Sequence, residues 1–215
     1  ETTINNDIED TSTTNDDTDY QGGDGQYYAW LSDGTDLPSE WAIPYVGTAY
    51  NNGLTTQKTL QNFTNNITRE EFCELVVNLY EKTLGKSIAI TSPAVFDDTT
   101  NVAIAKAYEI GIVSGYGDGR FGPVDEITRE QLMTMFYRLL TKLDVKYASE
   151  IHPSLEFADS DFLSDWAIEG AKSLVAYELI DGVGNNLLAP KDQATIEQSL
   201  KLVNGVYEFY ILDNR

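Results

Sequence analysis

The chain of 215 residues is 41% hydrophobic, which suffices for a core in one large domain or two small ones. Its 35 acidic and 14 basic residues give a formal charge of −21, which argues against a sequence-independent grip on nucleic acid and against adsorption to anionic lipid. The single cysteine, Cys73, rules out an intrachain disulfide and is expected to be buried, and no apolar run is long enough to span a bilayer.

The first 26 residues differ in composition from the rest of the chain. They are rich in Thr, Asn, Asp and Gly and contain no Lys or Arg. Because such a segment has little apolar surface to bury, residues 1–26 are predicted to form an acidic leader or linker. The remaining chain carries one pattern in three copies, which predicts units at residues 27–87, 88–150 and 151–215.

Each predicted unit contains a glycine-containing turn, which in two units follows a short helix that opens at a tryptophan. In the first unit the helix opens at Trp41 and the turn contains Gly53. In the third unit the corresponding residues are Trp166 and Gly182. The second unit has the longest glycine-rich turn, Gly-Ile-Val-Ser-Gly-Tyr-Gly-Asp-Gly-Arg-Phe at residues 111–121.

A longer helix follows each turn and begins with the same four-residue pattern. The copies are Thr68-Arg69-Glu70-Glu71, Thr128-Arg129-Glu130-Gln131 and Thr195-Ile196-Glu197-Gln198. Each fits a capping box, and the apolar residues that follow recur with the period of a helix that has one buried stripe. One helix pair cannot bury its own stripe, so an all-α domain with pseudo-threefold symmetry is predicted.

The capping box explains the Thr and the Glu or Gln of this pattern, but it does not explain Arg69 and Arg129. A cation at the first helical position faces the positive end of the helix dipole, where it is disfavoured. An anionic ligand would make that placement useful. Ile196 takes the same place in the third copy, which predicts that a third site is impaired.

These residues resemble the S-layer homology repeat of bacterial surface proteins. The second copy matches the repeat closely from Gly111 to Gln131, and the resemblance spans about residues 31–210. The first copy lacks the Gly-Tyr-x-Asp-Gly core of the turn, and the third copy lacks the Arg. The resemblance implies a three-pronged spindle around a central three-helix bundle.

The resemblance also implies a function: non-covalent anchoring of a surface protein through a secondary cell-wall polysaccharide that carries pyruvate ketals. Such a protein would be a monomeric module outside the cell, in the cell wall or S-layer, and would not insert into the membrane. The ligand would lie in grooves between neighbouring repeats. The residues carried over to these grooves are Arg69, Arg129, Gly115, Tyr116, Gly117, Asp118, Gly119, Trp41, Trp166, Glu71 and Gln131.

The chemistry of these residues suits such a ligand. A helix N-terminus is expected to offer free N–H donors, and an arginine adds a planar fork that matches a carboxylate. Trp and Tyr offer flat apolar faces to sugar C–H groups. Arg129→Ala is therefore expected to weaken polysaccharide binding more than a change at Arg138, which serves as the charge-matched control.

Each of these residues also has a purely structural interpretation. Arg69 and Arg129 could pair with nearby acids on the surface, and Trp41 and Trp166 could pack in the core. The glycines at 115, 117 and 119 could be needed for positive φ in the turn. The sequence leaves these alternatives open.

Two other functions remain alternatives at this stage. One is a degenerate repeat domain that serves as a structural or protein-interaction module without glycan binding. The other is a wall-active hydrolase with two opposed carboxylates in a deep cleft. One histidine and one cysteine argue against a His-rich metal site and against most nucleophilic triads, so no enzyme activity, cofactor or metal is predicted.

Overall fold

A computed structural model describes residues 37–144 and 154–213. The predicted leader, residues 1–26, lies outside the described part. The helices are α1 (Ile43–Asn51), α2 (Arg69–Leu84), α3 (Val102–Glu109), α4 (Arg129–Lys142), α5 (Ile168–Ala176) and α6 (Ile196–Asp213). Short 3₁₀ turns lie at Lys58–Leu60, Ser160–Phe162 and Asp165–Ala167.

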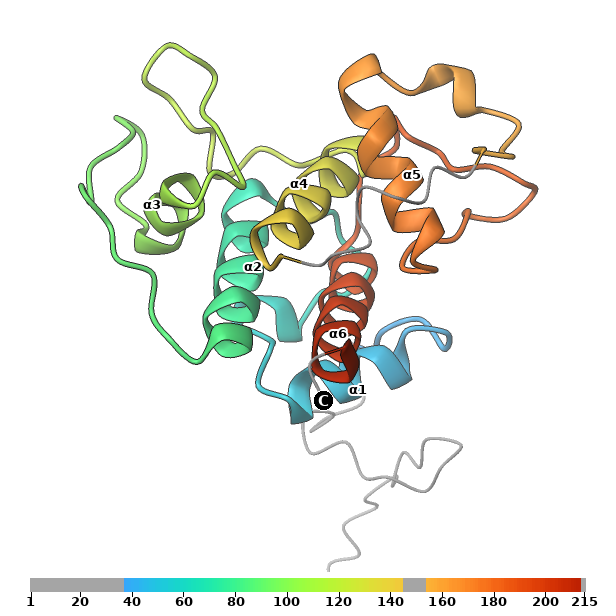
Figure 1. The fold of residues 1–215 in the computed structure, drawn as a ribbon, viewed down its shortest axis with the longest axis horizontal. Coiled ribbons are helices and arrows are strands. Elements are labelled where there is room, and N and C mark those ends of the chain that lie inside the picture. The colour runs from blue at the N-terminus through green and yellow to red at the C-terminus, as the bar shows by residue number, and fades with distance from the viewer. Residues whose placement is uncertain (1–36, 145–153, 214–215) are drawn as a thin grey trace, which may run out of the picture.

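The predicted all-α class is confirmed, since the described residues contain helices and isolated β-bridges but no strand. The three longest helices, α2, α4 and α6, lie in the middle of the fold, while α3 and α5 lie on opposite sides and α1 lies beside α6 (Figure 1). The spindle shape implied by the resemblance stays an expectation.

The three inner helices begin with the predicted caps. The hydroxyl of Thr68 accepts a hydrogen bond from the backbone N–H of Glu71, whose carboxylate accepts one from the backbone N–H of Thr68. Thr128 and Gln131 form the same reciprocal pair at α4. In α6 the pair is formed by residues 195 and 198. The capping box therefore fixes where all three inner helices start.

A closed ring of backbone hydrogen bonds joins the residues that precede these caps. The N–H of Ile67 donates to the carbonyl of Ala194 (2.9 Å), the N–H of Ala194 donates to Ile127 (2.9 Å), and the N–H of Ile127 donates to Ile67 (3.3 Å). All three side chains are buried. The ring brings together segments about 60 to 130 residues apart in the sequence and sets the helices around one axis.

The next two N–H groups of each inner helix also donate across the fold. Each pair reaches two carbonyl oxygens in the loop that precedes a neighbouring inner helix. The bonds are Arg69 to Asp125, Glu70 to Pro123, Arg129 to Asp192, Glu130 to Pro190, Ile196 to Asn65 and Glu197 to Phe63, at 2.8–3.0 Å. The expectation that these helix N-termini offer free N–H donors to a ligand is therefore wrong, because the loops and caps already use them.

Each outer helix packs on the inner helix of another unit. Helix α3 packs on α2, α5 packs on α4, and α1 packs on α6, which joins the two ends of the described chain (Figure 1). The two helices of one unit therefore do not have to bury their apolar stripes by themselves. The contact between α1 and α6 closes the circle of packed helices.

The core lies between the inner helices. The rings of Phe72 in α2 and Phe136 in α4 meet edge to face, with their centroids 5.5 Å apart. Cys73 is buried as predicted, and this burial raises the pKa of its thiol well above the ordinary value.

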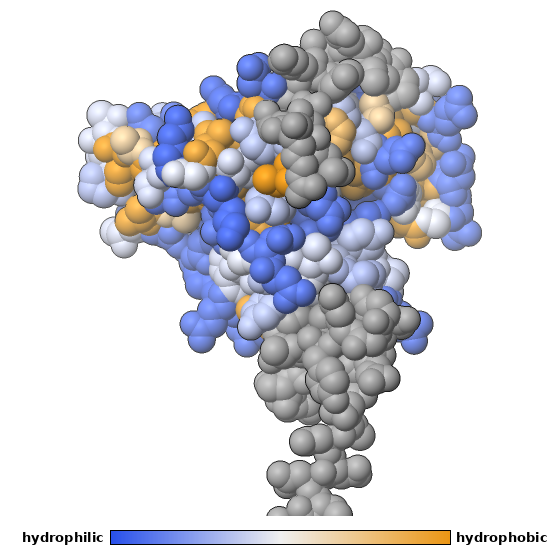
Figure 2. Space-filling model, turned by 60° about the horizontal axis from the view of Figure 1, so that its bottom comes forward, coloured by the Kyte–Doolittle hydropathy of each residue, from blue (hydrophilic) through white to orange (hydrophobic). Residues whose placement is uncertain are grey.

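The surface carries both hydrophobic and hydrophilic residues (Figure 2). In Figure 2 hydrophobic residues gather toward the left and right sides of the visible face, and hydrophilic residues dominate its middle. None of the described helices is long and apolar enough to cross a membrane.

Removal of a cap should destabilise the fold measurably. We expect Thr128→Ala to lower the free energy of unfolding by about 1 kcal/mol, because the N–H of Gln131 loses its acceptor. Thr141→Ala is the matched control, since its exposed hydroxyl bonds only the carbonyl of Tyr137 in the same helix, and it should change stability by less than about 0.5 kcal/mol. Urea unfolding of both variants measures the difference, and equal effects would contradict the role of the cap.

Candidate binding grooves

Arg129 begins α4 and is almost completely buried, at 3% exposed. Its Nε donates to the carbonyl of Leu188 (2.9 Å), Nη1 donates to Oε1 of Gln198 (3.1 Å), and Nη2 donates to the carbonyl of Asp181 (3.4 Å). Burial lowers the pKa of Arg129, and the charges of Asp192 and Asp159 partly oppose this shift. The guanidinium therefore ties α4 to the turn that precedes α6.

Arg69 plays the same part at the start of α2. Its Nε donates to the carbonyl of Phe121 (2.9 Å) and its Nη2 to the carbonyl of Ser114 (2.8 Å). The guanidinium carbon lies 4.2 Å from the ring centroid of Phe121 and 5.0 Å from that of Tyr116, both within reach of a cation–π contact. Neither arginine pairs with an acid within the described residues, so the surface ion pair considered from the sequence is wrong for both.

A groove of about 500 Å³ lies beside Arg129, and we call it the Arg129 groove. Trp41 of the turn before α1 and Tyr45 of α1 line it, together with Lys201 of α6 and Asp181 of the turn that precedes α6. Trp41 is 46% exposed, so it is not a core residue. The groove is thus built from three regions that are far apart in the sequence.

A smaller groove of about 170 Å³ lies beside Arg69, and we call it the Arg69 groove. Its lining includes Gln131 and Arg138 of α4, Ser114 of the glycine-rich turn, and Trp166. Trp166 is 55% exposed, so it also lies outside the core. Because Arg138 lines this groove, it is not the neutral control that sequence alone suggested.

The two grooves have the same plan. Each combines an arginine from one inner helix, part of the turn before the next inner helix, that next helix itself, and a tryptophan from the remaining unit. Each also has a second cation. Lys201 pairs with Asp181 at 2.5 Å and lies 5.6 Å from the ring centroid of Tyr45, while Nη1 of Arg138 donates to the carbonyl of Ile112.

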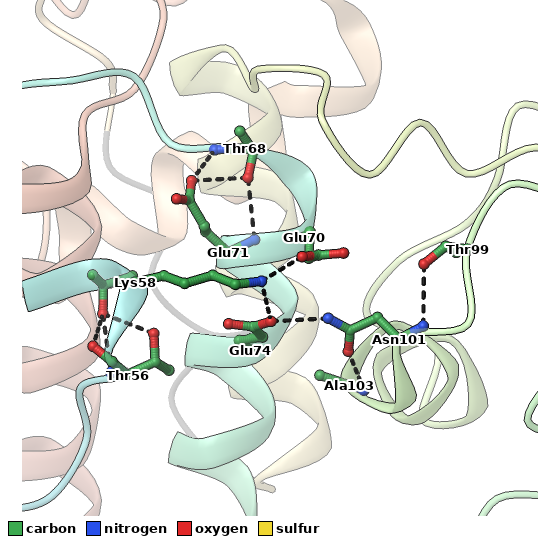
Figure 3. Close-up of polar contacts among 10 residues, drawn as sticks. Thr56, Lys58, Thr68, Glu70, Glu71, Glu74, Thr99, Asn101 and Ala103 are labelled. Carbon is green, nitrogen blue, oxygen red and sulfur yellow. Dashed lines mark hydrogen bonds and ion pairs between the residues drawn. The ribbon is translucent and has the colours of Figure 1, made fainter. Parts of the chain in front are cut away.

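The third interface, between the third and first units, differs from the two grooves. Ile196 replaces the arginine, and Val102 stands where the other units have tryptophan. Lys58 reaches across α2 to both Glu70 and Glu74, and the amide of Asn101 donates to the same Glu74 (Figure 3). These bonds raise the pKa of the Lys58 ammonium above its usual range. An internal polar network thus occupies this side of α2.

The glycine-rich turn places Tyr116 beside the guanidinium of Arg69. Its Tyr116 is half exposed and donates a hydrogen bond from its hydroxyl to Asp125 (2.7 Å), and burial together with this carboxylate raises the pKa of Tyr116. Asp118 pairs with Arg120 at 2.8 Å on the surface. It is not among the residues that line either groove.

The glycines of this turn serve different purposes. Gly117 and Gly119 have φ of 90° and 88°, which other residues rarely adopt, as predicted. Gly115 does not have positive φ. A Cβ there would lie 2.4 Å from the ring of Phe96 and 2.6 Å from the carbonyl oxygen of Arg120, so close packing is the reason for glycine.

Two aspartates that sequence reasoning did not select hold the turns. The carboxylate of Asp98 accepts the N–H groups of Phe121 and Gly122, which holds its pKa below the usual range. Asp159 accepts the N–H groups of residues 188 and 189 in the same way. Asp98 lies 23 residues before its partner and Asp159 lies 29 residues before its own, so the sequence signal they share is a phenylalanine two positions earlier, Phe96 or Phe157.

The remaining predicted site residues are Glu71 and Gln131. Both serve the capping boxes of their helices, and Gln131 also lines the Arg69 groove. Glu71 lies in the first turn of α2 and lines neither groove. Among the described residues that line the two grooves, Asp181 is the single acid, so neither holds the carboxylate pair of a hydrolase.

Comparison with known proteins identifies one of these units. Residues 96–133, which include the glycine-rich turn and the start of α4, match the family model of the S-layer homology domain. The chain carries an S-layer homology domain. The matched residues include the glycine-rich turn at residues 111–121 and Arg129.

Similar proteins carry comparable segments. An endoglucanase of Bacillus sp. (strain KSM-635) is 30% identical over 172 residues, which cover 77% of this chain and 18% of the endoglucanase. The cellulosome-anchoring protein of Acetivibrio thermocellus is 30% identical over 149 residues, 67% of this chain and 32% of that protein. A cell surface protein of Thermoanaerobacter kivui is 30% identical over 112 residues, 52% of this chain and 14% of that protein.

The chain thus spans about a third or less of the length of these relatives. The S-layer homology domain and the cell-surface relatives indicate an extracellular location associated with the cell wall.

The buried position of Arg129 predicts a stability role for this side chain. Arg129→Ala leaves the carbonyls of Leu188 and Asp181 without donors, so we expect the free energy of unfolding to fall by about 2 kcal/mol or more. Arg120→Ala is the control, because its side chain is exposed and pairs only with Asp118, and it should leave the urea midpoint nearly unchanged. A similar loss in both variants would show that Arg129 does not hold the turn.

Proposed function

We propose that this chain is a non-covalent anchoring module that binds an anionic cell-wall glycan in the Arg129 and Arg69 grooves. The observation that carries this proposal is the shared plan of the grooves. In each, an exposed tryptophan, a buried arginine and a second cation surround one hollow although they come from distant parts of the sequence.

The charge distribution supports an anionic ligand bound locally. The chain as a whole carries a formal charge of −21, so its long-range field repels anions. Arg129 and Lys201 nevertheless line one groove, with Asp181 as its single described acid. Recognition would then depend on short-range hydrogen bonds, since a carboxylate can replace Asp181 on Lys201 and accept from the N–H groups of Arg129 that the fold leaves unused.

The aromatic side chains support a sugar as the rest of the ligand. The rings of Trp41 and Tyr45 lie 6.5 Å apart at the Arg129 groove, and Trp166 flanks the other groove. Their flat apolar faces suit sugar C–H groups, and the indole N–H and phenol O–H suit hydroxyls. A polysaccharide that carries pyruvate ketals supplies both the apolar faces and the carboxylate, and it is the ligand that we propose.

The relatives agree with an anchoring role. One is named as a cellulosome-anchoring protein and one as a cell surface protein, while the endoglucanase matches over only 18% of its own length. A short segment attached to proteins of different activity is what an anchoring module requires. The third interface favours a second candidate, a structural or protein-interaction module, since its Lys58 network occupies the side of α2.

Binding should depend on groove residues other than the buried arginines. We expect Trp41→Ala and Lys201→Ala each to weaken binding to purified, pyruvylated wall polysaccharide by about tenfold, because a stacking surface or a cation is lost. Calorimetry should give a stoichiometry near two occupied sites per protein chain, one in each groove.

Tyr108→Ala and Lys172→Ala are the matched controls, since these side chains lie outside both grooves, and their affinities should equal that of the unaltered chain. Polysaccharide from which the pyruvyl groups have been removed should bind at least about tenfold more weakly. Equal binding of both polysaccharides would refute the proposal that the pyruvyl carboxylate is recognised. Absence of binding to either polysaccharide would favour the second candidate, a structural or protein-interaction module.

A further inference from the structure

A glutamate occupies the second position of each inner helix, and the capping box does not account for it. These residues are Glu70, Glu130 and Glu197. Glu130 and Glu197 are both 5% exposed, which is unusual for a carboxylate. The helix dipole favours an acid in the first turn, yet a surface position would satisfy that preference at lower cost. Burial of these two acids therefore calls for specific partners.

Glu197 holds the segment that precedes Trp41. Its Oε2 accepts the backbone N–H of Ser39 at 2.8 Å, and its Oε1 accepts the hydroxyl of the same serine at 2.8 Å. The carbonyl of Ser39 in turn accepts the N–H of Ala42 (2.7 Å) and that of Ile43 (3.2 Å). Ser39 thus begins the turn that carries Trp41, and a two-point contact with α6 fixes it.

Glu130 holds the equivalent segment before Trp166. Its carboxylate accepts the N–H of Ser164 (3.0 Å) and its hydroxyl (3.2 Å), and Lys191 pairs with the same carboxylate at 2.5 Å. The carbonyl of Ser164 accepts the N–H of Ala167 (2.8 Å). In both units the serine lies two residues before the tryptophan.

Glu70 provides an internal comparison. The second unit has no tryptophan at the equivalent place, where Val102 stands, and has threonine instead of serine two residues earlier. Glu70 is bound by Lys58 instead, and Asn101 turns to Glu74 (Figure 3). The glutamate–serine contact is thus present in the two units that have a groove tryptophan and replaced in the unit that lacks one.

We propose that Glu130 and Glu197 are positioning residues for the tryptophan walls of the two grooves. Each carboxylate fixes the backbone of a serine, and the serine fixes the turn that holds the indole opposite the buried arginine. This inference deepens the proposed function, because it rests on the grooves as ligand sites. Glu197 has the larger task, since Ser39 and Trp41 come from the N-terminal end of the described chain and α6 from its C-terminal end (Figure 1).

The test uses the full chain labelled with 5-fluorotryptophan and ¹⁹F NMR, with signals assigned through single Trp→Phe variants. We expect Glu197→Ala to shift and broaden the signal of Trp41 and to leave that of Trp166 unchanged. Glu130→Ala should have the reverse effect. Glu197→Gln should preserve the Trp41 signal, because the amide oxygen can accept the N–H of Ser39 while the amide N–H₂ donates to its hydroxyl.

Calorimetry with purified, pyruvylated wall polysaccharide gives the second readout. Glu197→Ala should weaken binding at one site by about tenfold or abolish it, and Glu197→Gln should stay within about twofold of the unaltered chain. The inference is overturned if Glu197→Ala leaves the Trp41 signal unchanged, or if the Ala and Gln variants bind equally well after the Ala variant has shifted that signal.

A folding defect can be separated from a loss of position. If Glu197→Ala unfolds the chain, Ser39→Ala removes only one of the two contacts and should shift the Trp41 signal alone, whereas no shift would overturn the inference. The NMR result needs no ligand. A selective shift in a chain that binds no polysaccharide would therefore reject the proposed function and keep the positioning role.

Discussion

The ring of backbone hydrogen bonds among Ile67, Ile127 and Ala194 is the constraint on which the rest of this fold depends. Its members are buried, so each N–H that lost its carbonyl would be left unsatisfied at considerable cost. The ring places three helix starts side by side. The first two N–H groups of every inner helix then reach a neighbouring loop, and each outer helix packs on an inner helix of another unit.

The grooves follow from this interlocked arrangement. Because each unit extends onto its neighbours, an arginine, a glycine-containing turn and a tryptophan from different units surround the same hollow. Arg69 and Arg129 consequently have two tasks. They fasten the turn of the next unit through its carbonyl groups, and each also lines a groove. A binding arginine that is also a structural support would be held rigid, which lowers the entropy lost when a ligand binds.

Local sequence signals predicted the local structure well. The caps at Thr68 and Thr128, the apolar stripes and the buried Cys73 all depend on residues within one or two helical turns, so propensity and period suffice. The same reasoning failed for the helix N-termini and for Gly115. In those cases the deciding contact lies outside the segment, such as the loop carbonyls that accept the helix N–H groups, or Phe96 and Arg120 around the glycine.

The sequence by itself determined where the three inner helices begin, and that two of the three units carry an arginine and two carry a tryptophan, whereas it did not single out α3. The tertiary structure alone decided that these arginines are buried, that Lys201 and Arg138 join the grooves, and that Glu197 binds Ser39. The physical reason is distance along the chain. A cap or a stripe is a contact between near neighbours, whereas a groove wall needs partners up to 158 residues apart, and only closure of the ring brings them together.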